Sequence, residues 1–257
     1  MSSMPRLFVN AGLVAGEPFA LDEAQANYLT RVMRLGTGDA ARVFNGRDGE
    51  WRARISKAEG RRAEMTPVER LREQTGQGGA PLTLLFAPVK KSETDFIVEK
   101  ATELGAAAIR PVITERTQTR TVRLDRFLKI ALEAAEQTER LDLPDVADAV
   151  SLDTALAALP EGTVLIFCDE AGNDADAPWG GQAGRARPMA EMLPGIKGRS
   201  AAILIGPEGG FSPDERSHLR ARADTYPVSL GPRILRAETA AVAAMTLWQA
   251  ICGDWAA

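Results

Sequence analysis

Two glycine-proline segments near the carboxyl end of this 257-residue chain carry the side chains best suited to chemistry. Residues 206–211 read Gly-Pro-Glu-Gly-Gly-Phe, and residues 231–236 read Gly-Pro-Arg-Ile-Leu-Arg. We name them the first elbow and the second elbow. Glycines let the backbone approach a ligand closely, while Arg233 and Arg236 can bind an anion or stabilise developing negative charge. The pattern indicates a site for a small cofactor beside an anionic substrate.

The elements that must position these residues are short apolar strands. Residues 201–205 form an apolar run before the first elbow, and residues 228–230 precede the second. A short apolar run followed by glycine is typical of a buried parallel strand with a sharp turn at its carboxyl end, where open α/β sheets bind ligands. Neither elbow has the Gly-Lys-Ser/Thr ending of a P-loop or the Gly-x-Gly-x-x-Gly dinucleotide pattern.

Several ordered motifs resemble one known family. The strings at 204–210 and 230–239 resemble the two signature loops of the ribosomal small-subunit RNA uridine-N3-methyltransferases, which belong to the knotted SPOUT superfamily. Residues 31–35, 99–105 and 136–140 are similar to the family's amino-terminal and middle motifs. The resemblance extends over nearly the whole chain, so it is more specific than one glycine loop.

The resemblance implies both an architecture and a cofactor. It implies a PUA-like β-barrel followed by an α/β SPOUT domain with a parallel sheet and a deep trefoil knot, working as a homodimer. It also implies S-adenosylmethionine, held at the loops after three strands. The expected cofactor-binding residues are Phe167, Cys168, Ile205, Gly206, Pro207, Glu208, Gly209, Gly210, Leu230, Gly231, Ile234, Leu235 and Thr239. Gly209→Val is expected to block donor binding through steric conflict and backbone strain.

The implied reaction is methylation of N3 of a specific uridine in small-subunit (16S) ribosomal RNA. N3 carries a proton between two carbonyls, so a cation that stabilises the deprotonated base would promote methyl transfer. Arg233 and Arg236 are the expected catalytic residues. Alternatively, these arginines form ion pairs with Glu208 or Glu238 that pin the loops. Glu238 itself acts either as a general base or as a residue that caps the start of the following helix.

Two other functions stay open at this point. One is methylation of a ribose 2′-hydroxyl by an enzyme of the same superfamily. The other is a non-catalytic RNA-binding or assembly protein with a vestigial pocket. The sequence specifies neither the modified uridine nor whether the substrate is naked RNA or an assembled subunit.

The charge distribution is compatible with an RNA partner although the net charge is −4. Residues 31–72 hold eleven Lys or Arg against six Asp or Glu, and residues 110–129 hold six against two. Basic patches neutralise phosphates whatever the total charge. A charged stretch is also often only a solvated face. The expected RNA-binding residues are Arg31, Arg34, Arg52, Arg54, Arg116 and Arg120.

Other features of the composition narrow the class of protein. Cys168, Cys252 and the single histidine, His218, do not form a metal-ligand pattern, so no metal is expected. No apolar stretch is long enough to span a membrane, and residues 1–10 lack a signal-peptide core. We therefore expect a cytoplasmic protein without a membrane partner.

The chain divides near residue 75 by composition. Residues 1–72 are expected to form the barrel, 73–81 a linker and 82–257 the methyltransferase domain. In the first part, strands are expected at 6–9, 41–44 and 50–55, with a hairpin turn at 45–49 and a helix over 22–35 that places Tyr28, Leu29, Val32 and Leu35 on one face.

Strands and helices alternate in the second part, which predicts a parallel sheet covered on both faces. Strands are expected at 82–86, 109–113, 163–167 and 201–205, and helices at 124–140 and about 238–252. Further helices begin at capping-box patterns, Ser92 with Asp95 and Ser212 with Glu215, and the first should turn Phe96 inward. Residues 171–199, with six glycines and three prolines, are expected to form a long loop.

Overall fold

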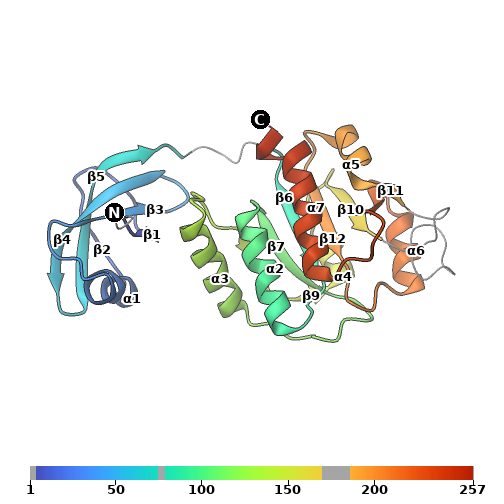
Figure 1. Cartoon of the computed structure of the whole chain (residues 1–257), viewed down its shortest axis with the longest axis horizontal. Coiled ribbons are helices and arrows are strands. Elements are labelled where there is room, and N and C mark those ends of the chain that lie inside the picture. Colours follow the sequence, from blue (N-terminus) through green and yellow to red (C-terminus); the bar gives the residue numbers. More distant parts are fainter. Residues whose placement is uncertain (1–3, 75–78, 170–185, 257) are drawn as a thin grey trace. The chain divides into compact units, whose positions relative to one another are not determined.

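The computed structural model describes residues 4–74, 79–169 and 186–256 (Figure 1). The chain forms two compact units. One comprises Met1–Gly76 together with Ala135–Leu143, and the other comprises Gln77–Ala134 together with Pro144–Ala257. In the first unit, buried Arg6 donates to the backbone carbonyls of Ala135 (2.7 Å) and Arg140 (2.6 Å). These bonds attach the 135–143 segment to the amino-terminal strands.

The first unit contains a five-stranded mixed sheet in the order β1-β3-β4-β5-β2 within the described residues. The strands are β1 (Arg6–Phe8), β2 (Phe19–Ala20), β3 (Ala40–Phe44), β4 (Glu50–Glu59) and β5 (Arg62–Arg72). The three strands predicted here are confirmed. Apolar side chains of alternate strand positions, such as Leu7, Val43 and Ile55, are buried in one cluster, as expected for a sheet with one covered face.

The turn between β3 and β4 is the predicted hairpin connection. Gly46 and Gly49 have positive φ angles (79° and 82°), which glycine adopts without strain. The Asp48 carboxylate accepts hydrogen bonds from Asn45 Nδ2 (2.6 Å) and from Leu13 N (2.9 Å). These bonds, the one from Asn45 above all, lower the pKa of Asp48.

The helix predicted over 22–35 starts as expected but changes its winding. Asp22 caps α1 (Glu23–Asn27) in a capping box, and a π-helical turn, η1 (Tyr28–Val32), follows. The expected common face is wrong, since Leu29 is fully buried while Tyr28 and Val32 are 39% and 62% exposed. The wider π turn, closed by Met33 N donating to Tyr28 O, breaks the 3.6-residue period on which the expectation rested.

The second unit contains a parallel sheet in the order β11-β13-β10-β12-β6-β7-β8 within the described residues, with β9 paired to β7. Its strands are β6 (Leu82–Phe86), β7 (Ala108–Ile113), β8 (Asp145–Val146), β9 (Val150–Ser151), β10 (Val164–Cys168), β11 (Arg187–Pro188), β12 (Ala201–Ile205) and β13 (Thr225–Ser229). The predicted strands and their parallel arrangement are confirmed. The central strand β12 is buried at every position, as its unbroken apolar sequence indicates.

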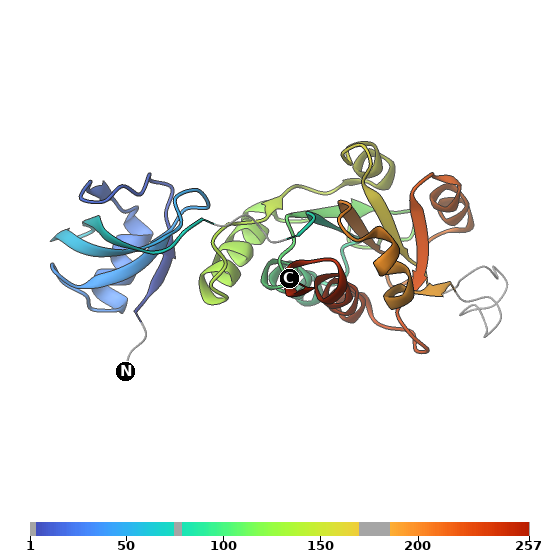
Figure 2. The same ribbon diagram turned by 90° about the horizontal axis from the view of Figure 1, so that it is seen from above.

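Helices cover both faces of this sheet, as Figure 2 shows. The helices are α2 (Lys91–Glu103), α3 (Leu124–Gln137), α4 (Leu152–Ala157), α5 (Met189–Met192), η2 (Leu193–Ile196), α6 (Pro213–Ala221), α7 (Ala237–Ile251) and η3 (Asp254–Ala256). Apolar residues of α2, α5 and α7 pack with one face of the strands, and those of α4 and α6 with the other. None of the helices in the described part of the chain has the length and apolar character needed to cross a membrane.

The start of α2 differs from the expectation. The predicted capping box of Ser92 and Asp95 is wrong, since Lys90 is the N-cap residue and makes no side-chain cap. Ser92 donates to Glu93 (2.8 Å) and the Asp95 carboxylate accepts two hydrogen bonds from Arg126 (2.7 and 2.6 Å). Phe96 is 40% exposed, so its inward placement was wrong. The second capping box is confirmed: Ser212 and Glu215 form it at the start of α6, with Pro213 in the first turn.

The predicted loop over 171–199 is wrong for its second half. β11, α5 and η2 occupy residues 187–196, and Met189, Leu193 and Ile196 are buried in the main core. Their apolar side chains fold the segment although it is rich in glycine and proline. Residues 171–185 of this loop, and residues 75–78 of the predicted linker, lie outside the described residues.

Candidate functional site

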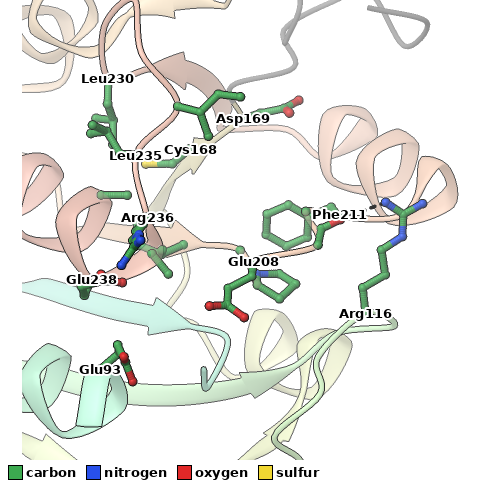
Figure 3. A pocket seen from close by; sticks show the side chains of 18 of the residues that line it. Glu93, Arg116, Cys168, Asp169, Glu208, Phe211, Leu230, Leu235, Arg236 and Glu238 are labelled. Atoms are coloured by element: carbon green, nitrogen blue, oxygen red, sulfur yellow. Dashed lines mark hydrogen bonds between the residues drawn. The ribbon is translucent and has the colours of Figure 1, made fainter. Parts of the chain in front are cut away.

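Both elbows open onto one cavity of about 720 Å³ at the carboxyl ends of the parallel strands (Figure 3). β10 lies between β12 and β13, so the carboxyl ends of these three strands are neighbours. The segments after β6 and β7 reach the same cavity through Lys90, Glu93 and Arg116. This is the edge at which parallel α/β sheets bind ligands.

Aromatic packing fixes the first elbow. A Cβ atom on residue 206 would lie 2.5 Å from Phe211 Cε2, so only glycine fits beside this ring. The Phe211 ring packs edge-on against Phe167, with ring centroids 5.0 Å apart. Gly210 N donates to Pro207 O (2.8 Å) and closes the turn, for which Gly210 adopts a φ of +67°.

One of the two reasons for the Gly209→Val expectation, backbone strain, was wrong, while steric conflict with the donor itself stays a prediction. A Cβ atom on residue 209 would meet Arg116 Cβ at 3.6 Å, an ordinary contact distance, and the backbone is not in the left-handed region. The two glycines that the structure requires in this elbow are therefore Gly206, for space, and Gly210, for its backbone angle.

The second elbow leads directly into α7. Gly231 has a φ of +121°, and Arg236 is the N-cap residue of the helix without a side-chain cap. Arg233 and Arg236 both line the cavity and are exposed. Within the described residues, neither arginine lies within 4 Å of a carboxylate oxygen, so the pinning ion pairs with Glu208 or Glu238 are not formed.

Most of the expected cofactor-binding residues come together at the cavity. Eleven of the thirteen line it: Cys168, Ile205, Gly206, Pro207, Glu208, Gly209, Gly210, Leu230, Gly231, Ile234 and Leu235. The other two do not. Phe167 is fully buried behind the first elbow, where it supports Phe211, and Thr239 is exposed on the first turn of α7.

A buried carboxylate in the cavity wall was missed by the sequence reasoning. Asp169, which directly follows β10, is 4% exposed and lines the cavity. Its Oδ2 accepts hydrogen bonds from Arg216 (3.2 Å) and Arg220 (2.7 Å), both on α6. Its place immediately after a buried strand was a usable signal, because the carboxyl ends of such strands form the ligand-binding edge.

A second carboxylate faces the second elbow from α2. Glu93 lines the cavity, and its pKa is lowered, chiefly by the Ser92 hydroxyl, which donates to it (2.8 Å), and to a smaller degree by the charge of Arg236. The other lining residues that were not expected are Lys90, Phe211, Arg216, Val228, Ala237 and Ala240. They carry no motif of their own.

The expected RNA-binding arginines differ in their surroundings. In the first unit, Arg31 and Arg34 are exposed around η1, and Arg34 has a φ of +57°. On β4, Arg52 pairs with Glu69, and Arg54 donates to Gly38 O (2.9 Å).

The remaining two expected RNA-binding residues, Arg116 and Arg120, belong to the second unit and are exposed in the segment after β7. Arg116 lines the cavity and donates to Gly209 O (3.0 Å), while Arg120 donates to Glu115 O (3.3 Å).

The side chains around the cavity are not those of a metal centre. Across residues 4–74, 79–169 and 186–256, no group of three or more His, Cys, Asp or Glu side chains could hold a metal ion. The cavity instead combines bare backbone at two elbows, apolar side chains and several arginines. Such a site suits an organic cofactor next to a polyanion.

Two family models match the chain. An RNA methyltransferase domain matches residues 78–249, and an RNA methyltransferase PUA domain matches residues 21–67. Among curated relatives, the ribosomal RNA small subunit methyltransferase E of Rickettsia conorii is 30% identical over 93% of both chains. That of Synechocystis is 36% identical over 93% of this chain and 75% of the relative.

Solved structures agree with these matches. The ribosomal RNA small subunit methyltransferase E of Neisseria gonorrhoeae, bound to S-adenosyl methionine, has a TM-score of 0.79 at 28% identity and covers 98% of this chain and 99% of its own. A methyltransferase of Legionella pneumophila with bound SAM has a TM-score of 0.80 at 27% identity, over 96% of this chain and 97% of its own. The cavity, its two elbows and these similarities together show that the chain belongs to the RNA methyltransferase family of the ribosomal RNA small subunit methyltransferases E.

Proposed function

We propose that the protein methylates N3 of a specific uridine in small-subunit ribosomal RNA, with S-adenosylmethionine as the methyl donor. The observation that carries this proposal is the convergence of Arg233 and Arg236 on the same cavity as the first elbow. The relatives are named as small-subunit ribosomal RNA methyltransferases, and two similar structures contain the donor.

The residues of the cavity fit the proposed donor. Gly206, Gly210 and Gly231 leave the backbone of both elbows bare. A Cβ at residue 206 would meet the Phe211 ring, and residues 210 and 231 have positive φ angles that strain any residue other than glycine. Ile205, Leu230 and Leu235 supply apolar surface next to this backbone. Bare backbone groups and apolar side chains are the usual surroundings of a nucleoside cofactor. When bound, S-adenosylmethionine supplies an electrophilic methyl group.

The arginines of the second elbow activate the acceptor. Uridine N3 is a nucleophile only after it has lost its proton, and the resulting negative charge spreads onto O2 and O4. Cationic N–H donors stabilise this anion more strongly than the neutral base. Arg233 and Arg236, which form no ion pair within the described residues, are available for this task and for an adjacent phosphate. Either solvent or Glu238, which also lines the cavity, takes the proton.

The remaining parts of the function concern assembly and location. We assign RNA binding to residues 1–72, a linker to 73–81 and methyl transfer to 82–257, with Arg31, Arg34, Arg52, Arg54, Arg116 and Arg120 contacting phosphates. The family resemblance also supports a homodimer in the cytoplasm without a metal. The trefoil knot of the superfamily stays a prediction.

One reconstituted reaction tests the proposed function. The purified protein is incubated with S-adenosylmethionine and small-subunit ribosomal RNA, either free or in assembled subunits, and the nucleosides are identified by mass spectrometry. We expect N3-methyluridine. A 2′-O-methylated nucleoside would instead identify a ribose methyltransferase. Absence of donor binding in calorimetry would show that the pocket is vestigial.

A further inference from the structure

The segment that follows β7 is held as a rigid turn beside the first elbow. Thr114 and Thr117 are each 3% exposed, and their hydroxyl oxygens lie 2.8 Å apart in a hydrogen bond. Thr114 N also donates to Thr117 Oγ1 (2.9 Å), and Thr117 N donates to Thr114 O (3.2 Å). The two residues between them, Glu115 and Arg116, are therefore presented from a fixed backbone.

This turn contacts the middle of the first elbow and the start of α6, which follows the elbow. Arg116 Nη1 donates to the carbonyl oxygen of Gly209 (3.0 Å), the contact drawn in Figure 3. Glu115 N donates to Glu215 Oε1 (2.8 Å) in the first turn of α6. The other oxygen of Glu215 accepts from Ser212 N (2.9 Å), directly after the elbow.

The first elbow needs such support from outside. Phe211 anchors the end of the elbow against Phe167, but four of its six residues are Gly or Pro, which leaves little side-chain surface to hold its middle. Arg116 supplies a charged donor to the carbonyl at its middle, and a hydrogen bond from a charged donor is stronger than one between neutral groups. Arg116 lines the same cavity as Gly209, so its removal changes the wall of the site and not a remote surface.

We propose that Arg116 is a positioning residue for the methyl-donor pocket, which holds the first elbow through the Gly209 carbonyl. The sequence pattern alone assigned this arginine to RNA. The inference rests on the proposed donor binding at this cavity, and it adds a role that contact with an RNA phosphate would not supply. The hydrogen bond from Arg116 thereby connects the first elbow to the basic segment 115–123.

The test compares Arg116→Ala with a matched control. Arg123→Ala removes the same charge from the same segment, but Arg123 is exposed and its hydrogen bonds go to Asp125 (2.6 and 3.3 Å). We expect calorimetry to show S-adenosylmethionine binding about tenfold weaker in Arg116→Ala and changed by less than about twofold in Arg123→Ala. A tenfold change corresponds to about 1.4 kcal/mol.

Kinetics separate positioning from a general structural or RNA-binding role. In steady-state methylation with RNA held at saturation, Arg116→Ala should raise KM for the donor about tenfold, a larger effect than that on kcat. Arg116→Lys, which keeps a charged donor, should recover part of the lost affinity. The melting temperature without donor should stay within about 1 °C of wild type, because the replaced side chain is exposed.

Other outcomes overturn the inference in distinguishable ways. If wild type binds no donor, the proposed function itself fails. If wild type binds donor and Arg116→Ala binds it equally well, with only KM for RNA raised, Arg116 is an RNA contact and the positioning role is refuted. Equal losses of donor affinity in Arg116→Ala and Arg123→Ala would show a general effect of charge, which also contradicts the proposal.

Discussion

The two glycines at positions 206 and 209 of the first elbow stand in very different surroundings. A Cβ on Gly206 would lie 2.5 Å from Phe211 Cε2 and 3.0 Å from Cδ2 and Cζ of the same ring. Phe211 cannot yield easily, because it is 7% exposed and its ring packs edge-on against the fully buried Phe167. At Gly209, the nearest side-chain atom, Arg116 Cβ, is 3.6 Å away. Alanine is therefore accommodated at 209 and not at 206.

The expected cost follows from packing an extra methyl group into a full space. Overpacking of this kind destabilises a protein by about 1–3 kcal/mol, and for a domain of this size each kcal/mol lowers the melting temperature by about 2–4 °C. Gly206→Ala should therefore melt roughly 2–12 °C below wild type. Displacement of Phe211 also alters the cavity wall, so donor affinity should fall at least about tenfold. Gly209→Ala should be neutral or slightly stabilising, since its φ lies outside the left-handed region and a Cβ has ordinary contacts there.

The assay is calorimetry of both variants, with thermal unfolding for stability and titration with S-adenosylmethionine for affinity. The reasoning is refuted if Gly206→Ala and Gly209→Ala lose stability and affinity to the same extent. A larger loss in Gly209→Ala would mean that the donor itself approaches the backbone at residue 209 more closely than at residue 206.

Three further predictions concern charged residues. Arg233→Ala or Arg236→Ala should slow single-turnover methyl transfer about 10²–10³-fold with donor affinity nearly intact. The rate should partly recover as pH rises, because alkaline solvent favours the N3 anion; an arginine that only pins the loop would give weaker donor binding and no recovery. Arg31→Glu combined with Arg34→Glu should weaken RNA binding and lower the slope of its salt dependence by about one unit per lost phosphate contact, and an unchanged slope would mark these residues as an ordinary solvated face. Asp48 has a lowered pKa in the folded protein, so its contribution to stability is full above its unfolded pKa of about 3.9 and is lost as pH falls through the lower folded value. Asp48→Asn should therefore be less stable than wild type at pH 7 in chemical unfolding, and the difference should shrink in acid; a constant difference would contradict this.

The strands and elbows could be predicted because their signals are local. The apolar run at 201–205 followed by Gly-Pro specifies a buried strand with a sharp end, and it folds that way as β12. The same logic placed Arg233 and Arg236 at the cavity. Capping at Ser212 was equally readable, since donor and acceptor lie three residues apart.

What the sequence did not reveal depends on contacts between distant segments. Asp169 meets Arg216 across 47 positions, and no spacing rule connects them. Glycine is needed at residue 206 because the Phe211 ring lies beside it, whereas no neighbour as close requires glycine at residue 209. The π-helical turn η1 was missed because its hydrogen-bond register leaves no distinct pattern of apolar residues.

The most direct test of the central claim is the nucleoside content of small-subunit ribosomal RNA from cells with and without this protein. Mass spectrometry of the digested RNA should find N3-methyluridine at one position in cells that carry the protein and none there in cells that lack it. Re-expression of the wild-type chain should restore the modification, and the Arg236→Ala variant should restore it poorly. Unchanged N3-methyluridine in cells without the protein, or loss of a 2′-O-methylated nucleoside in its place, would contradict the proposed reaction.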